Sequence, residues 1–288
     1  MRMSEIKIPE LAVFIEKANQ LKIQSSLHVA DTLAEITQDL QNLSLYQSLF
    51  ETNERGGLLA AMIVDQYQSG PNLIDEIWGP MTLPYNEPLR EHLLQKYLVN
   101  KKQHVETMFF FKEQDTWLTE QLIMRKNKLT YENIWRKSLA HAGSMPELPT
   151  VRIEHWQETV SSSIYKRVHQ LHEMAFHHAK RTMTNLLTNL SYSHSLWLLY
   201  DHDIIQSYAI VDIDLDRKNA HLDFIATDTH FLRHHAATQL ITAVCYGLHH
   251  QQVDYLYLVQ SDHAKAAYHL YEKLGFVKLE TDVAGSLT

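Results

Sequence analysis

The second half of the chain alternates between segments with the periodicity of strands and segments with that of helices. Around residues 170, 245 and 270, apolar side chains recur every three to four positions, which is typical of helices with one buried face. Short runs rich in Val, Ile, Leu and Tyr lie between them and are typical of strands. The pattern predicts strands over residues 151–156, 194–200, 204–212, 220–227, 253–259 and 276–280, and helices over residues 162–179, 182–190, 238–250 and 265–274.

The first half carries a fainter version of the same order. Its predicted elements run strand, strand, helix, strand, helix, strand, which is also the order of the last six elements of the second half. Such a repeat predicts two tandem domains of α/β class, each with a mixed sheet and helices on both faces, and a chance alternation of elements is the alternative. The predicted strands are 57–65, 72–78, 104–112 and 129–137, and the predicted helices are 89–101 and 116–126.

A change of composition near residue 150 divides the chain. All seven prolines lie at or before Pro149, and the first 150 residues hold four of the 19 histidines. Residues 140–149 have no apolar periodicity and are typical of a linker. We therefore predict one domain over residues 1–145 and a second over residues 151–288.

Composition and charge exclude several classes of protein. With 45% hydrophobic and 21% charged residues, the chain is of ordinary globular composition. A net charge of −8 argues against a nucleic-acid-binding protein. The longest apolar run, residues 58–64, is far shorter than the roughly 20 residues of a membrane helix, and the first residues lack the apolar core of a signal peptide. We therefore expect a soluble, cytoplasmic protein with no membrane partner.

Cysteine and glycine usage narrow the chemistry further. The single cysteine, Cys245, excludes an internal disulfide and a cysteine-built zinc site, and its place in an apolar helix stripe argues against a cysteine acyl-enzyme. The eight glycines include neither the GxGxxG of a dinucleotide-binding fold nor the GxxxxGK of a phosphate-binding loop. Any phosphate-binding turn must therefore work without those glycines.

Residues 262–276 (DHAKAAYHLYEKLGF) resemble the C-terminal signature of the GNAT superfamily of acyl-CoA N-acyltransferases. The family pattern is roughly Asn-x-x-Ala-x-x-Leu-Tyr-x-x-x-Gly-Phe. The chain departs from it at Ala264, which stands in the asparagine's place and lacks its polar contact to coenzyme A. The resemblance implies two tandem acyl-CoA N-acyltransferase-like domains, the first of them degenerate, with acetyl-CoA as co-substrate. The matching residues are Ala267, Leu270, Tyr271, Gly275 and Phe276.

The resemblance also implies a pyrophosphate loop of pattern Gln/Arg-x-x-Gly-x-Gly/Ala before the helix at 238–250. Aligned on Arg233, the two small positions fall on Ala236 and Thr238. Aligned on the apolar pair that follows, the arginine becomes Leu232 and the small positions become His235 and Ala237. In either register a helix N-terminus offers backbone N–H groups to a diphosphate, and an ordinary helix start is the alternative. The residues concerned are Leu232, Arg233, His234, His235, Ala236, Ala237 and Thr238.

The resemblance implies roles in direct acyl transfer from the thioester to an amine. Tyr271 matches the tyrosine that protonates the departing thiolate, with a packed helix tyrosine as the alternative. Ile225, Ala226 and Thr227 would lie beside the pantetheine arm and supply the oxyanion donor. We expect Leu222, Phe224 and Ala226 to share one face of their strand and His221, Asp223, Ile225 and Thr227 the other. Asp223 is our candidate general base, with His221, Asp212 and Asp214 as competitors.

The first domain lacks a comparable loop. Pro84 and Pro88 stand where the pyrophosphate turn should be, and proline removes backbone N–H donors. We expect this domain not to bind acyl-CoA.

Two alternatives to the transferase stay open. One is a catalytically silent protein of this fold that binds acyl-CoA or a partner. The other is a metal protein, because His169, Glu173 and His177 recur every four residues along one predicted helix. For the transferase we expect a small-molecule or peptide amine as acceptor. The sequence fixes neither that acceptor nor the oligomeric state.

Overall fold

The chain folds into two compact units. The computed structural model describes residues 6–140, 151–176 and 183–287. Unit 1 comprises Met1–Glu132 and Glu280–Thr288, and unit 2 comprises Asn133–Leu279. These units differ from the predicted division into 1–145 and 151–288, because the segments that close each half are exchanged.

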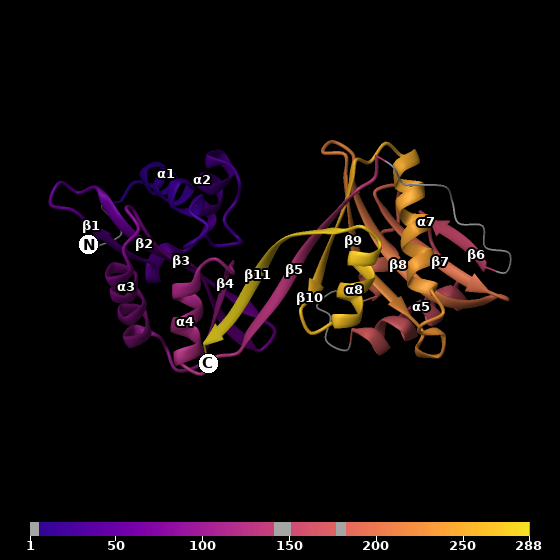
Figure 1. Cartoon of the computed structure of the whole chain (residues 1–288). Coiled ribbons are helices and arrows are strands. Elements are labelled where there is room, and N and C mark those ends of the chain that lie inside the picture. Colours follow the sequence, from indigo (N-terminus) through magenta and orange to yellow (C-terminus); the bar gives the residue numbers. More distant parts are fainter. Residues whose placement is uncertain (1–5, 141–150, 177–182, 288) are drawn as a thin grey trace. The chain divides into compact units, whose positions relative to one another are not determined.

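Unit 1 is built on a sheet of order β1-β2-β3-β4-β11, in which β3 and β4 are parallel. Helices α1 and α2 cover one apolar face and α3 and α4 the other (Figure 1). Its elements are α1 (Ile8–Asn19), α2 (Leu33–Asn42), η2 (Leu45–Gln47), β1 (Leu49–Thr52), β2 (Leu58–Ser69), β3 (Asn72–Thr82), α3 (Glu87–Asn100), β4 (Val105–Lys112), α4 (Thr116–Met124) and most of β11 (Val277–Leu287).

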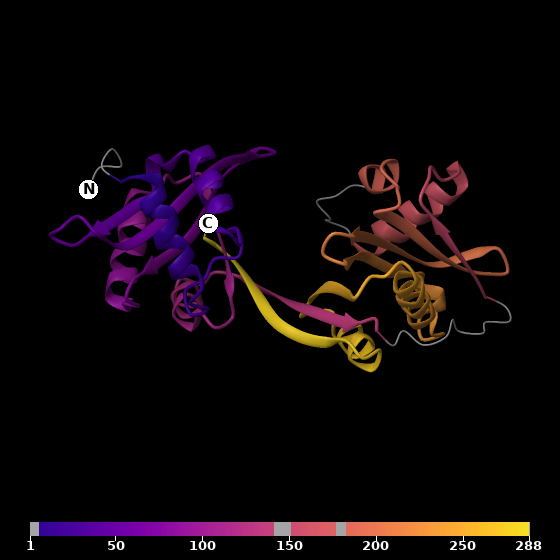
Figure 2. The ribbon, with the colours of Figure 1, turned by 90° about the horizontal axis from the view of Figure 1, so that it is seen from above.

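Unit 2 is built on a sheet of order β5-β10-β9-β8-β7-β6, in which β9 and β10 are parallel. Helices α5 and α6 cover one face, and α7 and α8 the other (Figure 2). Its elements are most of β5 (Leu129–Ser138), β6 (Val151–Trp156), α5 (Ser162–Ala175), α6 (Met183–Thr188), β7 (His194–Asp201), β8 (Ile204–Asp214), β9 (Asn219–Thr227), η3 (Thr229–Phe231), α7 (Ala236–His250), β10 (Tyr255–Ser261) and α8 (Lys265–Lys273).

The order of elements confirms the predicted mixed α/β fold. Each predicted strand and helix is present, although α5 ends at Ala175, before the predicted end at residue 179. Residues 177–182 lie outside the described residues. Three further elements, α1, α2 and β1, precede the repeat and were not predicted from the sequence. No helix among the described residues is long and apolar enough to cross a membrane.

The final strand of each half contributes to the other unit. The part of β11 from Glu280 onward belongs to unit 1. It pairs with β4 in antiparallel register from Asp282 to Leu287, and its Val283 lies in the core of unit 1. Conversely, Trp135 of β5 is 2% exposed in the core of unit 2. The alternation of apolar residues predicted both strands, but alternation determines which side chains are buried and not which neighbouring strand is chosen. Local pattern therefore could not reveal the exchange.

Candidate active site

Strands β9 and β10 form a fork in the sheet of unit 2. Their parallel pairing runs from Asn219–Tyr255 to Leu222–Leu258. Beyond it, residues 223–227 of β9 and 259–261 of β10 continue without pairing with each other, all of them described residues. Backbone groups on the facing sides of such a fork are available to an extended ligand with amide groups. We call these two stretches the fork of unit 2.

A β-bulge at Asp223 marks the start of this fork. On β8, Ile210 lies opposite Phe224 and Val211 opposite Leu222, so Asp223 is the extra residue. The bulge overturns the predicted faces, because an extra residue reverses the alternation. Leu222 packs with Ile225 on the α7/α8 side. Phe224 and Ala226 pack on the α5/α6 side.

The predicted oxyanion segment lies on the β9 arm of the fork. Ser207 of β8 holds this arm from its other edge, donating a hydrogen bond of 2.8 Å from Oγ to the carbonyl oxygen of Ala226. The hydroxyl groups of Ser207 and Thr227 lie 3.0 Å apart. Because β8 fixes one edge, the other edge of Ile225, Ala226 and Thr227 faces the fork.

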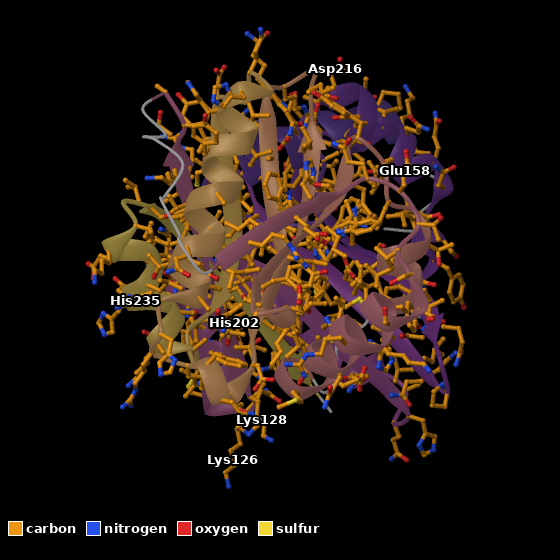
Figure 3. All side chains as sticks on the ribbon, turned by 90° about the vertical axis from the view of Figure 1, so that its right-hand side faces the viewer. Lys126, Lys128, Glu158, His202, Asp216 and His235 are labelled. Carbon is orange, nitrogen blue, oxygen red and sulfur yellow. The ribbon has the colours of Figure 1, made fainter. Side chains whose placement is uncertain are left out.

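The loop before α7 contains two residues in the left-handed conformation. Arg233 has φ +66° and His235 has φ +63°, a region that glycine adopts without steric cost. His235 is the N-cap of α7, whereas Ala236 is already helical. The conformation therefore favours the alignment that places His235 and Ala237 in the family's small positions and Leu232 in the arginine's place. The side chains of residues 232–235 are exposed, and His235 lies at the outside of the ribbon (Figure 3).

The start of α7 lacks the usual side-chain cap. Within the part of the chain that the structure describes, no N-cap side chain accepts a hydrogen bond from the first backbone N–H groups of α7. The first turn of this helix has no acidic residue. By contrast, Ser161 caps α5 through the backbone N–H of Ile164. Unsatisfied N–H groups and the helix dipole make an uncapped start attractive to an anion. The buried Ala236 and half-buried Ala237 leave this start open to close approach.

An ion pair that sequence reasoning missed anchors the end of β9. Arg167 of α5 forms a hydrogen-bonded ion pair with Asp228, and its Nε donates to the carbonyl oxygen of Ile205 at 3.2 Å. The Asp228 carboxylate also accepts hydrogen bonds from the backbone and ring nitrogens of His230. The two charged partners are 61 positions apart, so no local pattern connects them. The pair positions the residues between the fork and the α7 loop.

This ion pair predicts a loss of stability in acid. Burial disfavours the charged carboxylate, yet the hydrogen bonds from Arg167 and His230 lower the pKa of Asp228 to about 2. Because the pKa of Asp228 is lower in the folded state than in the unfolded state, its ionisation stabilises the fold at pH values above about 4. This contribution disappears as the pH falls toward 2. The expected loss is about 2 kcal/mol.

Urea unfolding at pH 4 and pH 2 measures this loss, and Asp228→Asn should show a smaller difference between the two values. Asp203→Asn is the matched control, because the Asp203 side chain is 87% exposed in its ion pair with Arg152. An equal pH dependence of the wild type and Asp228→Asn would contradict the assignment.

Tyr271 lies in the core between α8 and the sheet. Its ring contacts Phe276 at 5.6 Å and Trp135 at 6.4 Å between centroids, and Ala267 packs against the same core cluster. Burial raises the pKa of Tyr271 to about 12, so the phenol keeps its proton near neutral pH. The N-cap of α8 is Ala264, and no side-chain hydrogen bond caps the helix there.

The candidate bases lie on neighbouring strands. Asp212 of β8 is opposite both His194 of β7 and His221 of β9, and it forms an ion pair with His194. The His221 ring stacks on Tyr257 of β10, with centroids 5.5 Å apart. Asp223 follows two residues after His221, at the bulge. Asp214 is exposed at the end of β8, farther from the fork.

Of the residues behind the thiol and metal alternatives, the structure describes Cys245, His169 and Glu173. Cys245 is buried, and burial raises the pKa of its thiol to about 11, as expected for an unreactive core cysteine. Across residues 6–140, 151–176 and 183–287, no three His, Cys, Asp or Glu side chains are grouped as a metal ion would require. His177, the third proposed ligand, lies outside these ranges.

Residues 162–276 match the model of the acetyltransferase (GNAT) family. The match extends from the first residue of α5 to Phe276 and so includes the fork, the α7 loop and α8. A comparison with curated protein sequences gave no match.

Solved structures of this family share the fold over nearly the whole chain. A GCN5-related N-acetyltransferase from Sphaerobacter thermophilus has 14% identity and a TM-score of 0.67, covering 97% of this chain and 92% of its own. A tandem GNAT protein from the clavulanic acid biosynthesis pathway has 12% identity and a TM-score of 0.56, with coverage of 97% and 94%. A glucosamine N-acetyltransferase region of a fungal multi-domain β-N-acetylglucosaminidase has 8% identity and a TM-score of 0.62, with coverage of 97% and 37%. These likenesses confirm the tandem fold.

Proposed function

Because residues 162–276 belong to the acetyltransferase (GNAT) family, we propose that unit 2 transfers an acetyl group from acetyl-CoA directly to an amine. The observation that carries the proposal is the fork between β9 and β10 beside the uncapped start of α7. The fork suits the two amide groups of the pantetheine arm, and the helix start suits the diphosphate. A small-molecule or peptide amine is the proposed acceptor.

The diphosphate would bind the first backbone N–H groups of α7. The glycines of the family's loop are replaced, but the loop already has left-handed φ values at Arg233 and His235. Ala237 adds only a methyl group where the family allows Gly or Ala. Side chains of Arg233, His234 and His235 are exposed and supply positive charge if the histidines are protonated.

The transfer step would use groups along the fork. A base, for which we propose Asp223 with His221 as competitor, removes a proton from the attacking amine. The amine attacks the thioester carbonyl, and backbone N–H groups of residues 225–227 stabilise the oxyanion. The carbon–sulfur bond then breaks, and Tyr271 protonates the departing thiolate. The phenol is protonated near neutral pH and so has a proton to give, and burial, which raises its pKa to about 12, makes it a weaker acid than a solvent-exposed tyrosine.

Release of free thiol from acetyl-CoA tests the proposal. We expect thiol release with at least one amine from a panel of small-molecule and peptide amines. Tyr271→Phe should lower kcat at least about tenfold, because the proton donor is lost. It should leave folding intact, because a phenylalanine ring keeps the contacts with Trp135 and Phe276.

Tyr268→Phe is the matched control, since this tyrosine precedes Tyr271 by one turn of α8 and also packs on Trp135, at 4.9 Å between centroids. It should keep wild-type kcat. Coenzyme A binding without thiol release for any amine would contradict the transferase and indicate the silent form.

A further inference from the structure

Unit 1 contains a second fork of the same kind. Parallel pairing of β3 and β4 runs from Leu73–Val105 to Ile77–Phe109. Residues 78–82 of β3 and 110–112 of β4 then continue without pairing with each other, and all of them are described residues. As in unit 2, an antiparallel hairpin precedes this fork and a helix connects its two strands. We call these stretches the fork of unit 1.

The fork of unit 1 is filled by the chain itself. Residues 24–27, between α1 and α2, make hydrogen bonds to both arms. The backbone N–H of Leu27 donates to the carbonyl oxygen of Phe110 at 2.9 Å, and Ser26 forms an antiparallel bridge with Phe111. On the other arm, the Gln24 side chain donates to the carbonyl oxygen of Thr82 at 2.8 Å and accepts from its N–H at 3.0 Å.

The residues inserted into the fork of unit 1 are buried, and a side chain of α3 holds the residue before them. Gln24, Ser25 and Ser26 are 0%, 6% and 3% exposed. Arg90 of α3 donates to the carbonyl oxygen of Ile23 at 3.2 Å and so fixes the residue that precedes the segment. The segment is therefore packed and hydrogen-bonded as an integral part of unit 1.

His28 extends the same segment to an acidic side chain of β3. Its Nδ1 lies 2.5 Å from Glu76 Oε1, and its ring stacks on Phe110 at 4.3 Å between centroids. Glu76 is one residue before the last parallel pair that precedes the fork, as His221 is in unit 2. In unit 1, the imidazole of His28 therefore lies beside β3 at the level where β9 of unit 2 carries His221, one of the candidate bases.

We propose that residues 24–28 are a resident occupant of the fork of unit 1, standing where unit 2 receives the pantetheine arm and the acceptor amine. The chain then has one coenzyme A site, in unit 2. The assignment of unit 2 rests on the proposed function, whereas the occupancy of unit 1 rests on the contacts above. The segment also completes the sheet of unit 1, because it forms hydrogen bonds with backbone groups of β3 and β4 that would otherwise need a bound ligand as partner.

Hydrogen exchange on the full chain, followed by mass spectrometry with and without saturating coenzyme A, tests this proposal. We expect peptides over residues 24–28 and 78–83 to be protected in the free protein and unchanged by coenzyme A, while exchange over residues 232–240 slows. Unprotected exchange over 24–28, or added protection of 24–28 or 78–83 by coenzyme A, would overturn it. If coenzyme A protects no segment and 24–28 stays protected, the occupant stands and the proposed function of unit 2 fails.

Gln24→Ala provides a second test. Loss of the acceptor for the Thr82 N–H should speed exchange over residues 78–83 about tenfold. Gln20→Ala is the matched control, because this side chain is exposed at the end of α1. Equal exchange over residues 78–83 in the two variants would overturn the proposal. If Gln24→Ala does not fold, the hydrogen exchange of the wild type with and without coenzyme A decides the question.

Discussion

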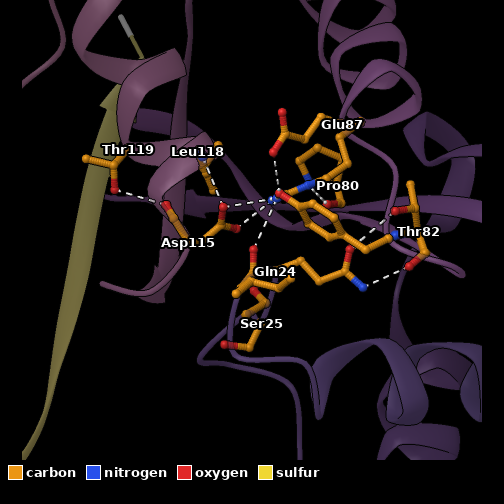
Figure 4. A network of polar contacts seen from close by, with 12 residues as sticks. Gln24, Ser25, Pro80, Thr82, Glu87, Asp115, Leu118 and Thr119 are labelled. Carbon is orange, nitrogen blue, oxygen red and sulfur yellow. Dashed lines mark hydrogen bonds and ion pairs between the residues drawn. The ribbon is translucent and has the colours of Figure 1, made fainter.

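Replacing Asp115 by alanine should lower the unfolding free energy of unit 1 by about 3–5 kcal/mol, because it leaves a buried arginine without its counter-ion. Arg90 is 0% exposed, and its two terminal nitrogens lie 2.5 and 3.0 Å from the carboxylate oxygens of Asp115 (Figure 4). Asp115 also caps α4 by accepting from the backbone N–H of Leu118 at 3.0 Å. The guanidinium also lies over the Trp117 ring, 4.2 Å from the ring centroid.

Urea unfolding of Asp115→Ala, monitored by hydrogen exchange in peptides of unit 1, measures this loss. Arg90→Met combined with Asp115→Ala should cost less than the sum of the single changes, since the uncompensated charge is then gone. Asp115→Asn, which retains an oxygen to cap α4, should fall between wild type and Asp115→Ala. A wild-type unfolding midpoint for Asp115→Ala would show that the ion pair contributes nothing.

The elements that the sequence predicted well are those defined by their own neighbours. The apolar stripe of α7 and the Tyr/Leu-rich run of β10 need no distant partner to be identified. The sequence also carries a signal for α2: Thr32 and Glu35 have the spacing of a capping box, and the Thr32 side chain accepts from the Glu35 N–H. This helix could have been found from the sequence.

The features that escaped prediction depend on contacts between distant segments. The bulge at Asp223 is defined only by the register with β8, and it reversed the faces expected for Phe224 and Ala226. The ion pair of Arg167 and Asp228 joins a helix to a strand end. The insertion of residues 24–27 into the fork of unit 1 is equally non-local, and the two prolines that argued against a coenzyme A site in this half gave no indication of it.

The start of α7 yields the second large prediction. Ala237→Glu should raise the Kd for coenzyme A about 100-fold or more. A carboxylate in the first turn would satisfy the helix N-terminus itself and would repel the diphosphate, and a unit charge at about 4 Å from another costs about 4 kcal/mol near a protein surface. The same charge at a helix start should leave the stability of the apo-protein unchanged or slightly raised. Calorimetric titration with coenzyme A and a thermal melt of the apo-protein measure both effects.

Ala237→Gln is the matched control, because it adds nearly the same volume without charge. If charge at the α7 start governs binding, the glutamine variant should lose far less affinity than the glutamate variant. The Kd of the glutamine variant for coenzyme A should also keep more of its dependence on ionic strength, since salt screens the charged contact between the diphosphate and the start of α7. Equal losses in the two variants would mean that the added side chain blocks the site by size alone. Unchanged affinity in both would place the diphosphate away from α7, and the assignment of this helix start as its site would be wrong.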